Sequence, residues 1–126
     1  MKKIINTTNA PAPIGPYNQA VMVNDTLYVS GQIALDPITG DLIDNTIEEE
    51  TLQVMKNLKA VLNAADLDFE NIVKTSIFLS DMGLFAKVND IYGKYFIADF
   101  PARETVAVKT LPKNVNVEIS AIAVKF

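Results

Sequence analysis

The residue with the clearest chemical potential in this sequence is its single arginine, Arg103. The other 10 of the 11 basic residues are lysines, and the chain has no histidine, cysteine or tryptophan. A planar guanidinium can grip a carboxylate through two parallel hydrogen bonds, which an ammonium group cannot do. Two roles are open for Arg103: an anchor for a small carboxylate, or an incidental arginine paired with a nearby acid.

Glu118 is the second candidate, because it interrupts an apolar segment between Val117 and Ile119. Side chains alternate between the two faces of a strand, so Glu118 points away from both neighbours. It is then either solvated on an open sheet face or placed near a subunit interface.

The absent residue types restrict the chemistry. Without histidine and cysteine the chain has no Ser-His-Asp triad, no His-ligated zinc and no thiolate metal site. Any catalysis must use carboxylates, hydroxyls, lysine, arginine, backbone groups and bound water, which suits an already activated substrate. We therefore expect neither a metal nor a cofactor.

Composition predicts the class of protein. With 126 residues, 49% of them hydrophobic, we expect one domain over 1–126. A formal charge of −4 and lysines that occur only singly or in pairs argue against a nucleic-acid or anionic-membrane surface. No apolar run is long enough to span a bilayer, and no secretory signal is recognisable. A cytoplasmic protein without nucleic-acid or membrane partners is the resulting expectation.

Hydrophobic periodicity and turn residues predict the elements that position these side chains. Strands are expected at 18–23, 27–34, 71–79, 104–111 and 115–126, with a short lead-in strand at 2–5, and helices at 47–65 and 82–97. Thr46 caps the first helix, and Glu48–Glu50 are interpreted as its solvated first turn. Aromatic residues of the second helix, such as Phe85 and Tyr92, are expected in the core. The order β-β-α-β-α-β-β predicts an α+β fold with both helices on one face of a sheet.

Alternation along the strands also assigns the two faces of that sheet. Leu27, Val29, Gly31, Ile33, Val117, Ile119, Ala121 and Ala123 are expected under the helices, and Tyr28, Ser30, Gln32, Asn116, Glu118, Ser120 and Ile122 on the opposite face. That second face is half apolar, and the chain has no further helices to cover it. We therefore expect an oligomer whose interface is this face.

Four segments of the chain carry a resemblance to a known family. They are Gly15-Pro16-Tyr17-Asn18-Gln19-Ala20, Val29-Ser30-Gly31-Gln32-Ile33, Pro101-Ala102-Arg103-Glu104-Thr105-Val106, and Leu111-Pro112-Lys113 through Val117-Glu118-Ile119-Ser120-Ala121-Ile122-Ala123. In this order and spacing they resemble the reactive intermediate deaminase A (RidA) family, also called the YjgF family, over essentially the whole chain. The resemblance implies a chorismate-mutase-like fold, a homotrimer with sites at subunit interfaces, and hydrolysis of 2-imino acids such as 2-iminobutanoate and 2-iminopropanoate to 2-oxo acids and ammonia.

The resemblance also implies roles for four catalytic residues. Arg103 would hold the substrate carboxylate as a bidentate partner. Glu118 would orient or deprotonate the attacking water. Ser30 and Tyr17 would complete the pocket wall, and Tyr17 would orient the substrate or exchange protons with it.

Three further positions are implied as substrate-binding. Gly31 and Thr105 would contact the substrate through backbone groups, and Asn89 would border the cleft. Many family members have cysteine where this chain has Thr105. The threonine is compatible with a role of the backbone at this position but not with a role that requires a thiol.

Two other functions compete with the deaminase. A non-catalytic regulatory trimer that binds small carboxylates would need Arg103 but not Glu118. An endoribonuclease or translation inhibitor, activities also attributed to family members, is disfavoured by the acidic charge, the single arginine and the absence of histidine.

Overall fold

The computed structural model describes residues 1–126 as one mixed sheet with two α-helices. In chain order the elements are β1 (Lys2–Ile5), β2 (Ala20–Val23), β3 (Thr26–Gln32), α1 (Ile47–Ala64), β4 (Ile72–Leu79), α2 (Phe85–Gly93), β5 (Ala102–Ala107) and β6 (Val117–Val124). Short 3₁₀ turns precede β4, α2 and β6. The predicted order of strands and helices is confirmed, and so is the short strand at 2–5.

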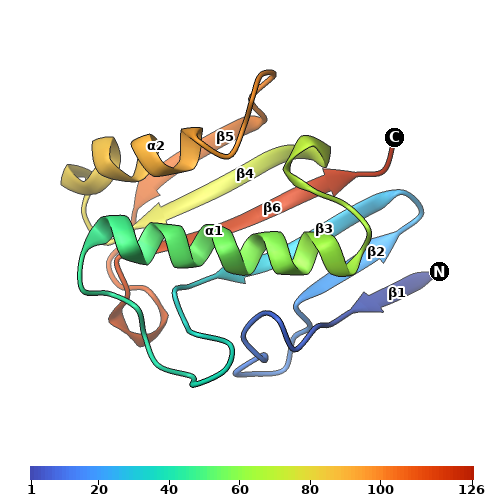
Figure 1. The fold of residues 1–126 in the computed structure, drawn as a ribbon, viewed down its shortest axis with the longest axis horizontal. Coiled ribbons are helices and arrows are strands. Elements are labelled where there is room, and N and C mark those ends of the chain that lie inside the picture. The colour runs from blue at the N-terminus through green and yellow to red at the C-terminus, as the bar shows by residue number, and fades with distance from the viewer.

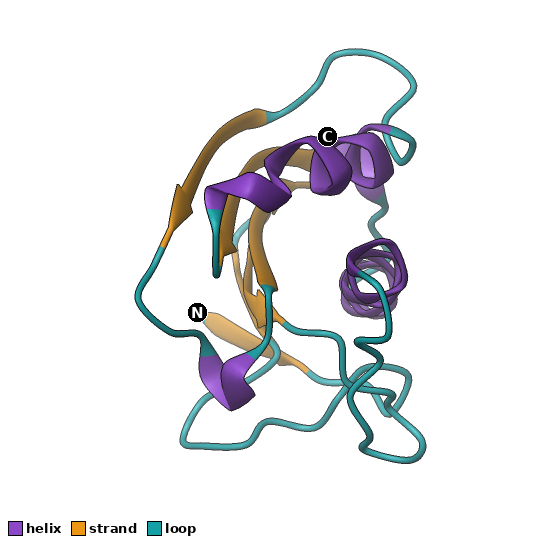
Figure 2. Cartoon of the chain, turned by 90° about the vertical axis from the view of Figure 1, so that its left-hand side faces the viewer, coloured by secondary structure: helices purple, strands orange, loops and turns teal.

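The sheet has the strand order β1-β2-β3-β6-β4-β5. Neighbouring strands are antiparallel except β4 and β5, which run parallel because α2 lies in the crossover between them. Both helices lie in front of the sheet in Figure 1, and the curved sheet with its helical cover is seen from the side in Figure 2. The expected α+β architecture with one covered face is confirmed. No helix is both long and apolar enough to cross a bilayer.

Helix α1 supplies much of the cover for the sheet. It begins after Thr46, whose hydroxyl accepts a hydrogen bond from the Glu49 amide at 3.1 Å, as predicted. Its inward side chains Val54, Leu58 and Val61 are all fully buried in the core. The helix therefore holds β3 and β6, the strands it contacts, in a fixed position.

Glu50 departs from the expectation of a solvated first turn, because it is fully buried. Its carboxylate accepts hydrogen bonds from the Asn116 amide and side chain at 2.7 and 2.9 Å, and from the Val117 amide at 3.2 Å. The first turn of α1 is thereby tied to the start of β6, directly before Glu118. Periodicity did not reveal this role, because the partners are distant in sequence.

Helix α2 is shorter than predicted. It spans Phe85–Gly93 rather than 82–97, because Met82–Leu84 form a 3₁₀ turn and the chain leaves the helix after its glycine. Beyond the helix, Tyr95 packs on Phe69 with ring centroids 5.0 Å apart. The aromatic stripe is in the core as expected, but part of it lies in a turn.

Strand β5 also differs from the prediction, since it spans Ala102–Ala107 rather than 104–111. Arg103 is therefore a strand residue, and it pairs with Thr75 of β4. Thr75 is fully buried on the covered face. Because paired residues on neighbouring strands share a face, Arg103 points to the side of the helices. The other strand and helix boundaries agree with the prediction to within two residues.

A β-bulge in β3 reverses the predicted facing of Gly31 and Gln32. Val29 pairs with Ala121 and Gln32 pairs with Ile119, so β3 has one more residue than β6 between these pairs. Gln32 is consequently buried at 6% exposure, and Gly31 faces the open side. Alternation with a period of two cannot predict this, because the extra residue shifts every side chain after it.

The sheet face opposite the helices carries apolar side chains without cover. Tyr28 is 51% exposed and Val106 is 44% exposed. Tyr28 pairs with Ile122, and Phe78 pairs with Glu118, so apolar and polar side chains alternate along this face. The mixed character expected for this face is confirmed.

Candidate active site

Arg103 is held by α2 and has no acidic partner. Its Nη1 donates a hydrogen bond to Asn89 Oδ1 at 2.8 Å, and its guanidinium lies 5.1 Å from the Tyr92 ring and 5.6 Å from the Phe85 ring. The two ion pairs of the chain are Lys59–Asp68 and Lys74–Glu104. The interpretation of Arg103 as an arginine paired with a nearby acid is therefore wrong, and its charge is available to an external anion.

Glu104, the acid next to Arg103, faces the opposite side of the sheet. It forms an ion pair with Lys74 at 3.1 Å and accepts a hydrogen bond from the Ser76 hydroxyl. The hydrogen bond from Ser76 and the contact with Lys74 lower the pKa of the Glu104 carboxyl. Glu104 therefore forms its contacts on the other face of the sheet and does not pair with Arg103.

A cavity of about 470 Å³ opens beside the guanidinium. Its walls are formed by Asn89, Tyr92, Gly93, Phe100, Pro101 and Arg103. Its volume is within the range of sites that hold small metabolites. A single cation in a largely uncharged cavity is suited to one carboxylate with a short side chain attached.

Glu118 lies on the open face, against Gly31. A Cβ atom on Gly31 would lie 2.7 Å from Glu118 Oε2 and 2.8 Å from its Cδ, which is closer than real side chains approach. Burial raises the pKa of the Glu118 carboxyl above its ordinary value. A carboxylate with a raised pKa is a stronger base, which is what a group that takes a proton from water requires.

Tyr17 and Ser30 lie near Gly31 at the same end of β3. The Ser30 hydroxyl donates to the Asn18 carbonyl at 2.7 Å, which holds the preceding loop against the strand. The Tyr17 hydroxyl accepts a hydrogen bond from the Ile14 amide at 3.2 Å. Tyr17 and Gly31 line one small cavity of about 20 Å³, roughly the size of one water molecule.

Thr105 shares the Arg103 side of β5, because residues two apart on a strand share a face. Its hydroxyl is buried and has no hydrogen-bond partner. The side chain therefore makes no use of its polar atom, which agrees with a role through the backbone.

The seven predicted site residues consequently form two groups within one chain. Arg103 and Thr105 on the edge strand β5 and Asn89 on α2 form the first group. The second group is Glu118 of β6 and Gly31 of β3 on the opposite face, with Ser30 next to Gly31 and Tyr17 in the loop before β2. Strand β4 separates the groups, so they do not meet in a single copy.

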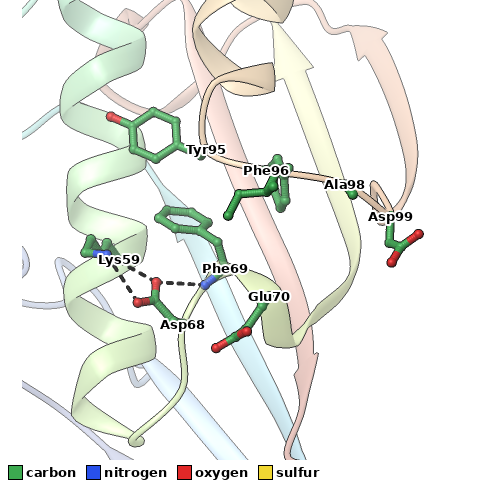
Figure 3. Close-up of a pocket in the computed structure, with 9 residues that line it drawn as sticks. Lys59, Asp68, Phe69, Glu70, Tyr95, Phe96, Ala98 and Asp99 are labelled. Carbon is green, nitrogen blue, oxygen red and sulfur yellow. Dashed lines mark hydrogen bonds and ion pairs between the residues drawn. The ribbon is translucent and has the colours of Figure 1, made fainter.

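A second cavity, of about 550 Å³, contains none of these residues (Figure 3). It lies between α1 and the segment after α2, and Phe69, Tyr95 and Phe96 form its aromatic wall. Its only cation, Lys59, is neutralised by Asp68 at 3.2 Å. Its other charged residues, Glu70 and Asp99, are acidic, so this cavity lacks the unpaired cation that distinguishes the one beside Arg103.

Comparison with known proteins identifies the family. The family model described as endoribonuclease L-PSP matches residues 7–125. A mouse protein named 2-iminobutanoate/2-iminopropanoate deaminase is 50% identical over 125 residues, which cover 99% of this chain and 93% of the mouse protein. The chain belongs to the RidA (YjgF) family. The resemblance of the four sequence segments is therefore confirmed.

Solved RidA-family structures have the same fold. YyfA of the conserved Rid family from Yersinia pestis superposes with a TM-score of 0.96 at 51% identity, covering 99% of this chain and 100% of that one. Escherichia coli TdcF with bound serine gives a TM-score of 0.94 at 38% identity, covering 98% and 99%. Serine carries a carboxylate, so this structural relative has been seen with a small carboxylate ligand.

Two of the three α2 residues that contact Arg103, Phe85 and Tyr92, were not predicted as site residues. Phe85 and Tyr92 were interpreted only as core aromatics, although they and Asn89 follow the spacing of one helix face. This spacing places all three toward a single side chain on the neighbouring strand. The lone arginine on β5, the next element along the chain, was the available signal.

Proposed function

We propose that this protein is a 2-imino acid deaminase, which hydrolyses 2-iminobutanoate and 2-iminopropanoate to 2-oxo acids and ammonia. The observation that carries the proposal is the unpaired guanidinium of Arg103 beside a cavity sized for a small metabolite. The name of the mouse relative, at 50% identity over nearly the whole chain, supports the same reaction.

The reaction mainly requires that the substrate and a water molecule be held in the correct position. A protonated imine is already electrophilic at its carbon, so a positioned water can attack without a metal. Arg103 holds the carboxylate, and Glu118 takes a proton from the attacking water as the carbon–oxygen bond forms. That proton then passes to the nitrogen of the carbinolamine. As the carbon–nitrogen bond breaks, Glu118 takes the remaining hydroxyl proton and the carbon–oxygen double bond forms, so that a 2-oxo acid and ammonia are released, and the ammonia leaves with the proton as ammonium.

We infer that the complete site is assembled between copies of the chain, in a homotrimer. The Arg103 group and the Glu118 group face opposite sides of the sheet, with β4 between them. The uncovered face around Tyr28 and Val106 offers the apolar surface that a second copy would bury. A neighbouring copy could then bring its Glu118 to the Arg103 edge, which one chain cannot do.

The activity is tested by a coupled assay in which threonine dehydratase generates the imine. We expect the wild-type protein to accelerate release of 2-oxobutanoate and ammonia, and Arg103→Ala to abolish the acceleration. Equal rates with and without wild-type protein would refute the deaminase. Acceleration by both proteins would refute the role of Arg103.

Two conservative variants test the roles separately. Arg103→Lys keeps the charge but loses the planar fork, so we expect severe loss of activity. Glu118→Gln keeps the size of the side chain but not the base, so ligand binding should remain while turnover is lost. Near-normal turnover in either variant would contradict the role assigned to that residue.

A regulatory module that binds small carboxylates is the second candidate. The serine bound to TdcF is the observation that favours it. Such a module would bind 2-oxobutanoate through Arg103, would show no imine turnover, and would be unaffected by Glu118→Gln. The coupled assay and a calorimetric titration with 2-oxobutanoate distinguish the two functions.

A further inference from the structure

We propose that Phe85, Tyr92 and Thr75 are positioning residues that hold the Arg103 guanidinium in its binding orientation before any ligand arrives. Together with Asn89 we call them the arginine clamp. The proposal deepens the proposed function, since it rests on Arg103 as the carboxylate anchor. The orientation itself can be measured whether or not the protein has deaminase activity.

The helix side of the clamp is one face of α2. Phe85, Asn89 and Tyr92 are spaced at i, i+4 and i+7, which places them in one row along the helix. All three contact the same group: Asn89 Oδ1 accepts from Nη1 at 2.8 Å, and the two rings lie 5.6 and 5.1 Å from the guanidinium carbon. Both ring distances are within the range of a cation–π interaction.

The strand side of the clamp fixes Tyr92 to the neighbour of Arg103. The Tyr92 and Thr75 hydroxyls are 2.8 Å apart, and both side chains are buried. Thr75 is the residue of β4 that pairs with Arg103 of β5. The contacts therefore form a closed circuit from Arg103 to Tyr92, from Tyr92 to Thr75, and across the strand pair back to Arg103.

This circuit has a consequence for binding. A free arginine side chain loses rotamer entropy when it grips a ligand, whereas a clamped one has already lost it on folding. Nη1 is engaged by Asn89, and the other N–H groups of the guanidinium have no partner within the chain. These N–H groups remain available to bind a carboxylate in the cavity that Tyr92 and Arg103 both line.

The single arginine makes the orientation directly measurable. In protein labelled with ¹⁵N-arginine, the only side-chain Nε–H signal belongs to Arg103. Two aromatic rings near the guanidinium should shift the Arg103 side-chain proton signals upfield, and NMR relaxation should report a rigid group. A random-coil shift with fast motion in the ligand-free wild-type protein would overturn the proposal, and this measurement needs no variant to fold.

Binding of 2-oxobutanoate tests the consequence of the clamp. We expect Phe85→Leu and Tyr92→Leu each to raise its Kd about 3- to 30-fold and to reduce the ring-current shift of Arg103. Tyr92→Phe keeps the ring and loses only the Thr75 contact, so its Kd should lie between those of wild type and Tyr92→Leu, with most of the ring-current shift retained. Tyr95→Leu is the matched control: it removes an aromatic residue packed on Phe69, and Kd should not change.

The outcomes separate this proposal from the proposed function. An unchanged Kd in both folded leucine variants would overturn the clamp, and so would an equal rise in Tyr95→Leu. If wild-type protein binds 2-oxobutanoate with a clamped Arg103 but has no imine turnover, the deaminase fails and the clamp stands. If turnover is present and Arg103 is mobile, the clamp fails and the deaminase stands.

Discussion

Substitution of Gly31 by alanine perturbs Glu118 without touching Glu118 itself. The added Cβ would lie 2.7 Å from Oε2, whereas an ordinary contact begins at 3.4 Å, so the carboxylate must retreat by roughly 0.7 Å. Gly31 has no positive φ, so alanine brings no backbone strain there. The clash extends from the carboxylate to Glu118 Cγ at 3.0 Å, but all of these atoms belong to one flexible side chain, so the free energy of unfolding should change by less than about 1 kcal/mol.

The activity should respond much more than the stability. A misplacement of about 1 Å at a catalytic group costs on the order of 100-fold in rate, so we expect Gly31→Ala to lower kcat about 30- to 100-fold. Binding of 2-oxobutanoate through Arg103 should be little affected in the same protein. Coupled imine hydrolysis, calorimetric titration and thermal unfolding measure the three quantities.

Gly83→Ala is the matched control, because Gly83 lies in the turn before α2 and its added Cβ would meet only the Asp81 side chain at 3.2 Å or more. We expect a wild-type kcat for this variant. If Gly31→Ala also retains the wild-type kcat, the packing of Gly31 against Glu118 has no role in the reaction. A large loss of stability in Gly31→Ala would refute the inference that only the Glu118 side chain moves.

Three further predictions concern single residues. Thr105→Val replaces a buried hydroxyl that has no partner with a methyl group, so the free energy of unfolding should rise by about 1–2 kcal/mol with kcat retained. Denaturant unfolding and the coupled assay measure the two quantities, and a destabilised or inactive variant would contradict the backbone role. Glu50→Ala should lower the free energy of unfolding by about 3 kcal/mol, because three donors lose their acceptor. The control Glu48→Ala removes an exposed carboxylate and should change this free energy by about 0.5 kcal/mol or less. Equal effects in urea unfolding would refute the role of Glu50 in tying α1 to β6. Glu118 acts as a base only when it is ionised, and burial raises its pKa. The value of kcat/KM should therefore fall as the pH is lowered through a midpoint above the ordinary glutamate pKa. A pH profile without this acidic limb would show that Glu118 does not take part in the proton transfer.

The sequence was informative where structure follows from local pattern. The Thr46 cap, the apolar stripe of α1 and the order of elements all depend on residues a few positions apart, and all are confirmed. Gly31 and Gln32 were assigned to the wrong faces, because a bulge is decided by how β3 pairs with β6. Sequence spacing carries no direct signal for that pairing.

The candidate site was predictable as a set of residues but not as a geometry. The chemistry of Arg103 and Glu118 could be inferred from residue type and from the family resemblance. Their separation depends on the strand order, in which β4 lies between β5 and β6, and their opposite facing depends on the register, which pairs Arg103 with Thr75 and Glu118 with Phe78. The burial of Glu50 depends likewise on a contact between the first turn of α1 and the start of β6. Tertiary contacts of this kind leave no trace in a periodic pattern.

The central claim is that Arg103 of one copy and Glu118 of another form a single deaminase site. Complementation tests it most directly: Arg103→Ala and Glu118→Gln are each assayed alone, then mixed after unfolding and refolding together, with subunit exchange verified by native mass spectrometry. Random mixing in a ring of identical subunits leaves about a quarter of the sites with both native residues, so we predict recovery of up to about a quarter of wild-type activity. No recovery in mixed oligomers would contradict a site shared between copies.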